Sequence, residues 1–361
     1  MVFKNKIIIS ELLKATEMKS TRISRRNFLQ KTAVTSGLGL VQTGLAGNIL
    51  NTKPDKEIPP HEVWIAGVSQ MNLRAATADE MVDQIFEILK EIKPYKPDFV
   101  CLPETFPFTN VEKQTTPNEK VAISERVLNR FSKFSIQNNC YSICPVYTQR
   151  NGKIFNAAVV FDRTGNRIGS YEKIHLAEYE INDGFTCGNL FQPVIKTEFG
   201  PIGIQICYDI EWDDGWTMLR KQGANIIFWP SAFAGGKCVN TKAWEHKCVV
   251  SSATNKNTAK LCEISGEVIA QTGIWNPNLF CAPVNLEKVF LPTWPAVEHF
   301  PEIQKKYGRR VQITNFHEEE WTVIESLSAD INVKDILKEF GLKSHEEVTT
   351  FVELLQAKSR E

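Results

Sequence analysis

The chain has 361 residues, enough for one large α/β domain or two smaller ones, and its formal net charge is zero at pH 7. Hydrophobic residues make up 42% and charged residues 23%, a composition typical of a soluble globular protein. The charge is uneven, because residues 1–46 carry eight basic and two acidic side chains and leave a net charge of −6 on the remainder. A mildly acidic body argues against nucleic acid as a partner.

The first segment combines an arginine pair with a short apolar run. Residues 24–31 read Ser-Arg-Arg-Asn-Phe-Leu-Gln-Lys, and an uncharged stretch with three glycines follows from Ala33 to Ala46. That stretch is too short and too rich in glycine for a good membrane span. The pattern resembles a twin-arginine export signal, with small residues at Gly44 and Ala46 that suit signal peptidase. We therefore expect residues 1–46 to be a signal segment and the protein to reach the bacterial periplasm.

Met18 offers a second start of translation, in which case residues 1–17 are not part of the protein. The alternative to a signal is a basic helix cap before a short apolar helix. We expect no stable membrane span once the signal is removed, and no lipid anchor, because no cysteine follows the apolar run closely. Residues 47–62 are polar and contain proline, which predicts a linker.

From residue 63 onward, short apolar runs alternate with amphipathic segments, which predicts an α/β fold with buried sheets for a domain over 63–288. The predicted strands are 63–68, 98–102, 141–147, 154–162, 167–171, 194–197, 202–207, 225–229, 249–253, 260–263 and 268–271. Helices are predicted around 81–92, 121–131, 216–222 and 242–247.

After residue 289 the prolines break regular structure, and two mixed-charge helices around 333–340 and 346–358 end the chain. We expect 289–361 to be a C-terminal extension that wraps the domain or contacts a second subunit. The chain has nine cysteines, none of them in a C-x-x-C pair, so a structural zinc site is not expected.

Three reactive side chains follow predicted strands. Glu104 comes directly after one strand, Lys173 lies just past another, and Cys207 ends an apolar strand before a polar turn. Taken singly, each has an ordinary explanation as an exposed acid, a surface lysine or a core cysteine. Strand ends are nevertheless where α/β folds place catalytic groups, and a strand followed by a turn can expose a nucleophile.

The three motifs occur in a fixed order along the chain. They are Pro-Glu at 103–104, Lys-Ile-His-Leu at 173–176 and Cys-Tyr-Asp at 207–209. They resemble the P-E, K-x-H-L and C-Y-D signatures of the nitrilase superfamily of carbon–nitrogen hydrolases, and the resemblance covers roughly 63–285. It implies a four-layer αββα sandwich, usually paired with a second subunit, in which Cys207 is the nucleophile, Glu104 the base and Lys173 the third catalytic residue.

The resemblance also implies a division of labour. A thiol is a poor nucleophile until it loses its proton, which Glu104 can accept. The Lys173 ammonium would stabilise the thiolate and the oxyanion, with the backbone N–H of Tyr208 as the second oxyanion donor. Glu180, with Glu178 as the alternative, would hold Lys173 or the substrate in place. No metal or organic cofactor is implied.

Trp229 and Ser231 lie in a strand that resembles the one following the family's nucleophile helix, so both are candidates for supporting the site or binding substrate. Four aromatic residues near the nucleophile either form an aromatic pocket or pack in the core; they are Trp212, Trp216, Trp229 and Phe233. Thr217 stands where the family has an arginine, which puts recognition of a substrate carboxylate by that helix in doubt.

The leading hypothesis is hydrolysis of an amide or an N-carbamoyl amine through a thioester on Cys207. Tyr208 and Asp209 after the cysteine resemble amidase-type members more than true nitrilases, which tend to have Trp-Glu there. The alternatives are nitrile hydrolysis, acyl transfer to an amine, and a catalytically silent binding protein. The expected partners are a small amide-like molecule and further copies of this chain, as a homodimer or higher oligomer. The substrate would be set by loops at 105–118, 177–185 and 232–242.

Overall fold

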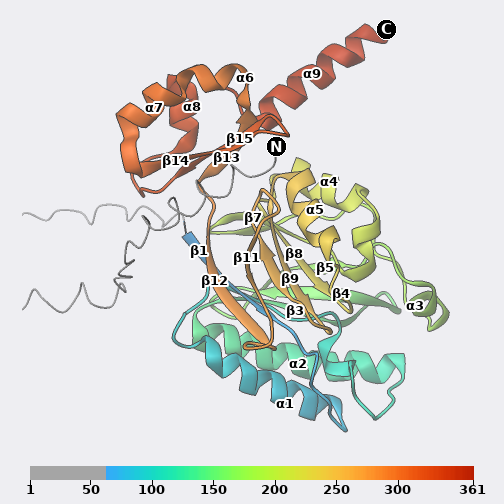
Figure 1. Ribbon diagram of the computed structural model, residues 1–361. Helices are drawn as coiled ribbons and strands as arrows, with labels where there is room; N and C mark the ends of the chain where they lie inside the picture. The colour runs from blue at the N-terminus through green and yellow to red at the C-terminus, as the bar shows by residue number, and fades with distance from the viewer. Residues whose placement is uncertain (1–61) are drawn as a thin grey trace, which may run out of the picture. The chain divides into compact units, whose positions relative to one another are not determined.

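The computed structural model describes residues 62–361 (Figure 1). The predicted signal segment and nearly all of the predicted linker lie outside the described residues and stay predictions. The described chain contains two six-stranded sheets and one three-stranded sheet. Within it, no helix has both the length and the apolar character needed to cross a membrane.

The first sheet has the strand order β12-β1-β2-β3-β4-β5. Its strands are β1 (Glu62–Val68), β2 (Phe99–Cys101), β3 (Tyr141–Arg150), β4 (Lys153–Phe161), β5 (Arg167–Glu172) and β12 (Leu279–Asn285). Strands β1, β2 and β3 are parallel because the helices α1 (Ala78–Leu89) and α2 (Pro117–Asn138) cross over between them. Helix α2 begins at a capping box formed by Thr116 and Glu119.

The second sheet repeats this plan with the order β11-β10-β9-β8-β7-β6. Its strands are β6 (Ile195–Thr197), β7 (Gly200–Ile204), β8 (Ile226–Ser231), β9 (Val249–Thr254), β10 (Lys260–Cys262) and β11 (Val268–Gln271). Here α4 (Asp214–Lys221) and α5 (Lys237–His246) are the crossovers between the parallel strands β7, β8 and β9. The short helix α3 (Glu178–Asn182) lies between β5 and β6 in the sequence.

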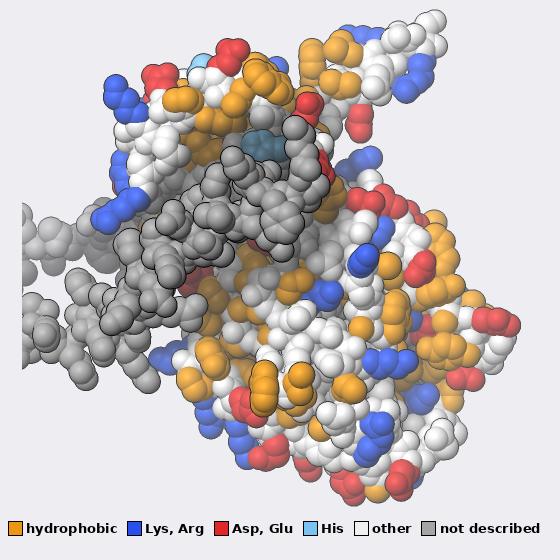
Figure 2. Space-filling model, viewed as in Figure 1, with side chains coloured by type: hydrophobic (Ala, Val, Ile, Leu, Met, Phe, Trp, Pro, Cys, Tyr) orange, Lys and Arg blue, Asp and Glu red, His pale blue; other side chains and the backbone are white. Residues whose placement is uncertain are grey.

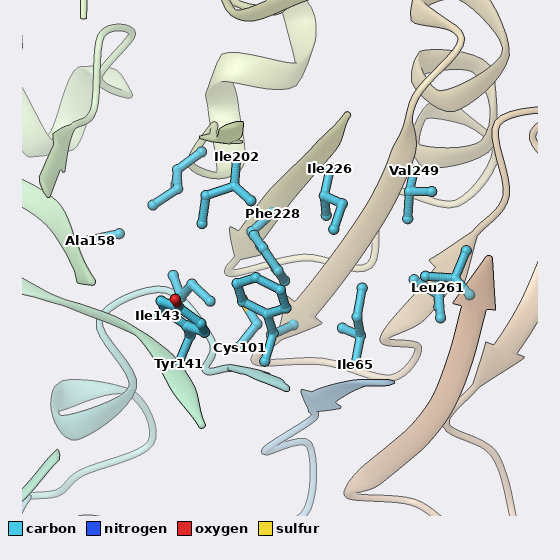
Figure 3. Close-up of a cluster of buried hydrophobic side chains, with 14 of the residues drawn as sticks. Ile65, Cys101, Tyr141, Ile143, Ala158, Ile202, Ile226, Phe228, Val249 and Leu261 are labelled. Atoms are coloured by element: carbon cyan, nitrogen blue, oxygen red, sulfur yellow. The ribbon is translucent and has the colours of Figure 1, made fainter. Parts of the chain in front are cut away.

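Alternating side chains divide the body into four layers. In β8, Ile226 and Phe228 belong to a core shared by both sheets, whereas Ile227 and Trp229 belong to a second core that includes residues of α4 and α5. Figure 3 shows the shared core, with Ile65 from the first sheet near Phe228 from the second. A third core lies between the first sheet and helices α1 and α2. The predicted α/β class and four-layer αββα sandwich are confirmed.

The C-terminal region is more regular than the sequence predicted. Helices α8 (Val333–Glu339) and α9 (His345–Ser359) match the two expected helices. The expectation that prolines prevent regular structure before them is wrong. This stretch contains β13 (Lys288–Pro292), α6 (Thr293–Ala296), α7 (Phe300–Tyr307), β14 (Val311–Phe316) and β15 (Trp321–Ser326). Pro292 is tolerated because it is the last residue of the edge strand β13 in the order β13-β15-β14.

The C-terminal sheet contacts the second sheet's helix α5. Trp244 of α5 packs edge-on against Phe290 and Phe316, with ring centroids 5.5 and 5.4 Å away. Lys288 forms ion pairs with Glu263 at 3.0 Å and Glu325 at 3.2 Å. Figure 2 shows charged side chains of both signs interspersed over the visible face of the described residues.

Candidate active site

The three predicted catalytic residues come from the ends of strands in both large sheets. Glu104 follows β2 and Lys173 directly follows β5, both in the first sheet. Cys207 opens a short 3-10 helix (Cys207–Glu211) just after β7 of the second sheet. The site therefore lies at the seam where the two sheets face each other.

Lys173 lies between two buried carboxylates. Its Nζ donates to Glu104 Oε1 at 2.8 Å and to Glu180 Oε2 at 2.6 Å. All three side chains are at most 3% exposed. Burial lowers the pKa of Lys173, but its negative neighbours, Glu104 first among them, outweigh burial and raise the pKa overall, so the lysine is a stable ammonium. Glu178, the alternative to Glu180, is exposed.

Asn156 of β4 completes this cluster, and sequence reasoning missed it. Its Nδ2 donates to Glu104 Oε1 and to Glu180 Oε1, each at 2.8 Å. Because carboxylate oxygens can only accept hydrogen bonds, these two bonds show that the amide nitrogen of Asn156, and not its amide oxygen, faces both carboxylates. The available signal was one buried asparagine among the apolar residues that follow Lys153 in β4, a position that demands hydrogen-bond partners.

Cys207 sits on a strained and firmly held backbone. Its φ of +48° is in the left-handed region, which is uncommon for a residue other than glycine. Trp229 Nε1 donates to the Cys207 carbonyl at 3.0 Å. Burial raises the pKa of the Cys207 thiol, and the charge of Glu104 raises it further, against the opposing effects of Lys173 and the Ala232 N–H. The resting residue is therefore a thiol, which requires a base before it can attack.

Asp209 joins the cysteine turn to the lysine loop. It is fully buried and accepts hydrogen bonds from the backbone N–H of Ile206 and of His175, both at 2.8 Å. The Tyr171 hydroxyl donates to the same carboxylate at 2.7 Å. One carboxylate therefore positions both the turn that holds Cys207 and the loop that follows Lys173. This explains why an aspartate two residues after Cys207 occurs together with the lysine motif.

His175 makes this junction sensitive to pH. Its Nδ1 lies 3.1 Å from Asp209 Oδ1, and its ring stacks on Trp212 with centroids 4.3 Å apart. The hydrogen bond to Asp209 raises the pKa of His175 above its usual 6.5, and burial only partly opposes it. The protonated ring thus stabilises the fold fully below about pH 6.5, and this contribution disappears as the pH rises through the folded-state pKa.

We expect His175→Gln to destabilise the protein more at pH 5.5 than at pH 8.5. Urea unfolding of both proteins across this range measures the difference in free energy of unfolding. A difference that stays constant with pH would contradict the ion pair.

A cavity of about 340 Å³ opens at this cluster. Its buried part is formed by Glu104, Tyr147, Asn156, Glu180 and Asn255, and its exposed rim includes Asn110, Tyr179 and Lys256. Each of the three loops expected to set the substrate contributes at least one lining residue. Residues 255–256, which follow β9, also line the cavity, although no sequence motif indicates this.

The other predicted site residues have supporting positions. The Tyr208 side chain is 40% exposed, and no partner is present for its N–H among residues 62–361. Ser231 is buried and accepts from the N–H of Phe233 at 3.0 Å. Trp229 and Ser231 do not line the cavity, and neither do Cys207 and Lys173. Lys173 meets the cavity wall through its hydrogen bonds to the lining residues Glu104 and Glu180.

The aromatic-pocket interpretation is wrong. Trp216 and Trp229 are fully buried in the core beneath α4 and α5, with Phe233 packed against it. Trp212 instead stacks on His175. The aromatic residues that line the cavity are Tyr147 and Tyr179.

One trio of possible metal ligands occurs in the described part of the chain, formed by Asp213, Glu245 and His246. Asp213 Oδ1 is already paired with His246 Nε2 at 2.7 Å and with Lys242 Nζ at 3.0 Å. These contacts satisfy the carboxylate with protein groups, and none of the three residues lines the cavity. The trio therefore gives no reason to assign a metal.

Comparison with known proteins defines the class. The carbon-nitrogen hydrolase family pattern matches residues 65–289. A deaminated glutathione amidase of Synechocystis is 24% identical over 255 residues, 63% of this chain and 93% of that protein. NitFhit of Drosophila melanogaster, a nitrilase and fragile histidine triad fusion protein, is 27% identical over 195 residues, 49% of this chain and only 42% of the fusion protein.

A solved structure shares the fold. The carbon-nitrogen hydrolase from Helicobacter pylori G27 superposes with a TM-score of 0.55 over 68% of this chain and 93% of the other, at 17% identity. The chain therefore belongs to the carbon–nitrogen hydrolase family of the nitrilase superfamily. It is an enzyme that acts on carbon–nitrogen bonds.

Proposed function

We propose that the protein hydrolyses a small amide or N-carbamoyl amine through a thioester on Cys207. The observation that carries this proposal is the buried Lys173 ammonium held between Glu104 and Glu180, at the seam where the Cys207 thiol also lies. A cavity of about 340 Å³ is at the small end of ligand pockets, which favours a small molecule over a protein chain as substrate.

The first half of the reaction forms the thioester. Glu104 accepts the thiol proton while Cys207 Sγ bonds to the carbonyl carbon, and the oxygen becomes an oxyanion. Lys173 and the Tyr208 N–H stabilise that oxyanion. Glu104 then delivers its proton to the nitrogen, the carbon–nitrogen bond breaks, and ammonia or an amine leaves.

The second half consumes one water. Glu104 accepts a proton from water as the water oxygen bonds to the thioester carbon, and the carbon–sulfur bond then breaks. The sulfur regains its proton from Glu104, and the carboxylic acid departs. The sum is amide plus water giving acid plus ammonia or amine. One oxygen of Glu104, Oε2, is buried without a hydrogen-bond partner among the described residues, which supports its use as the proton acceptor.

The test is turnover of a panel of amides, N-carbamoyl amines and nitriles, with ammonia release and the intact protein mass as readouts. We expect ammonia and a transient acyl adduct, both lost in Cys207→Ala, with activity falling by about 10⁴-fold or more. Cys187→Ala, at an exposed cysteine that does not line the cavity, is the matched control.

The same experiment distinguishes the alternatives. Nitriles as the preferred substrates would make the enzyme a nitrilase. An adduct that persists until an amine is added would indicate acyl transfer. If no compound gives either an acyl adduct or turnover, the proposal is contradicted and a silent binding protein is favoured.

Export to the periplasm and pairing of two or more copies are further proposals that rest on sequence resemblance. All nine cysteines are free, and only Cys187 and Cys238 are exposed, which limits disulfide formation in an oxidising compartment. Cell fractionation with N-terminal sequencing of the mature chain tests export. Light scattering measures the molar mass in solution and so tests the pairing of copies. The mass of a single copy would contradict that pairing.

A further inference from the structure

The turn between β11 and β12 carries the two most exposed large apolar side chains among the described residues. Ile274 is 88% exposed and Trp275 is 94% exposed. The Gly273 N–H donates to the Asn276 carbonyl at 3.2 Å, which closes a four-residue turn and places Ile274 and Trp275 at its tip. The stretch around the turn, residues 268–286, contains no charged side chain. An apolar pair left in water in this way marks a surface that binds something.

Hydrogen bonds hold two other loops against the base of this turn. The Ser69 N–H donates to the Asn278 carbonyl at 2.9 Å, and Asn278 Nδ2 donates back to the Ser69 carbonyl at 2.8 Å. Ser69 Oγ also donates to the Lys256 carbonyl at 3.2 Å. The loop 69–74 after β1 and the residues after β9 therefore lie beside the turn. Met71, which is 42% exposed, adds a third apolar side chain to this end of the sheets.

The charges at this end of the sheets are mostly positive. The loop that contains Glu112 belongs to it, because the Glu112 N–H donates to the Ala75 carbonyl at 3.0 Å. Three basic residues and one acidic residue occur in the segments 69–76, 111–113, 254–258 and 272–278, and all four are exposed; they are Arg74, Lys113, Lys256 and Glu112. Arg74 bonds only to carbonyl oxygens of its own loop, and neither Arg74 nor Lys256 forms an ion pair within residues 62–361. Both cations are therefore free to meet an anionic surface.

A lipid surface fits this end of the molecule better than a protein does. The Trp275 ring projects from the turn, and a protein partner would need a pocket shaped to receive it, whereas a bilayer admits a projecting side chain wherever the tip lands. Tryptophan also favours the boundary between lipid headgroups and acyl chains. Basic side chains beside such a tip are attracted to the negative surface of anionic lipids.

We propose that Ile274 and Trp275 insert into the headgroup region of an anionic phospholipid bilayer, with Arg74 and Lys256 bound to lipid phosphates. Because Lys256 also lies on the rim of the active-site cavity, this docking brings the rim to the lipid surface. The inference concerns the place where the enzyme works, and it does not depend on which carbon–nitrogen bond the enzyme cleaves.

The first experiment measures the partition coefficient of the full chain by co-sedimentation with vesicles of phosphatidylcholine that contain phosphatidylglycerol. We expect binding that weakens in high salt and in vesicles of phosphatidylcholine alone. Trp275→Ser should lower the partition coefficient about tenfold, and Trp275→Phe should retain most of the binding. Arg74→Gln should lower it about fivefold. Trp294→Ser, at an exposed tryptophan of the C-terminal region, is the matched control and should bind as the wild type does.

The second experiment reports on the tip itself, through quenching of tryptophan fluorescence by lipids with brominated acyl chains. The difference between the wild type and Trp275→Phe isolates the signal of Trp275, and residues 1–61 are common to both proteins, so any lipid contact of that segment cancels. We expect quenching in the wild type that Trp275→Phe loses. Equal quenching in the two proteins, or a partition coefficient that Trp275→Ser does not alter, would overturn the inference.

A chain that binds no vesicle of either composition would also overturn the inference, and the exposed tip would then be a surface for a protein partner. Both measurements are made without substrate. Their outcome is therefore separate from the test of amide hydrolysis, and either proposal can fail while the other stands.

Discussion

Glu104→Gln is expected to reduce turnover by about 10³-fold or more while the protein stays folded. The amide oxygen of glutamine can still accept the hydrogen bonds that Lys173 and Asn156 donate to Oε1, so the cluster keeps most of its contacts. What is lost is a group that can accept and return a proton. Because burial raises the pKa of the Cys207 thiol, little thiolate forms at neutral pH without that base.

The measurement is single-turnover ammonia release combined with the intact mass. We expect Glu104→Gln to accumulate no acyl adduct even from a substrate that the wild type acylates rapidly. Glu91→Gln, the same change at an exposed glutamate just after helix α1 and outside the cavity, should retain full activity. Wild-type acylation in Glu104→Gln would mean that another group removes the thiol proton.

Lys173→Met is expected to abolish activity and also to destabilise the protein by about 3–5 kcal/mol, because it leaves the carboxylates of Glu104 and Glu180 buried without their shared cation. Methionine has a similar length and fills the space, so the loss reports on charge more than on packing. Urea unfolding at pH 7.5 measures the change in the free energy of unfolding.

The companion variants separate the two effects. Glu180→Gln combined with Lys173→Met removes one of the two stranded charges and should recover part of the stability without restoring activity. Lys153→Met, at the exposed start of β4, controls for the substitution itself and should change stability little. Equal stability of Lys173→Met and the wild type would show that the cluster is not ionised as described.

The body of the fold was predictable because its strands and helices carry strong periodic signals. Alternation within β8 assigns Ile226 and Ile227 to opposite faces, and the motif residues Glu104 and Cys207 mark the ends of buried strands. The C-terminal sheet is not predictable in the same way, because prolines are typical of breaks, whereas β13 ends at Pro292 on a sheet edge where no ladder donor is needed.

The rest of the site was not predictable because it depends on which side chains meet in space. Asn156 and Asn255 carry no motif. Pairing of strands within the first sheet makes Asn156 a bridge between carboxylates, and docking of the second sheet makes Asn255 a tie to the Glu104 backbone. Trp229 was expected near the substrate from its place in the sequence. Strand alternation turns its ring to the opposite face of β8, where it supports the Cys207 backbone.

The seam between the sheets also has a consequence for biosynthesis. Every acidic and amide group of the cluster, together with Lys173, belongs to residues synthesised before Cys207, whereas Asn255 and the strand pair β8 and β9 come later. A nascent chain that has completed only strands β1 to β5 carries the proton acceptor without its sulfur. The site is therefore complete only after translation has supplied the whole second sheet, and the strand β12 that closes the first sheet beside β1 is synthesised later still.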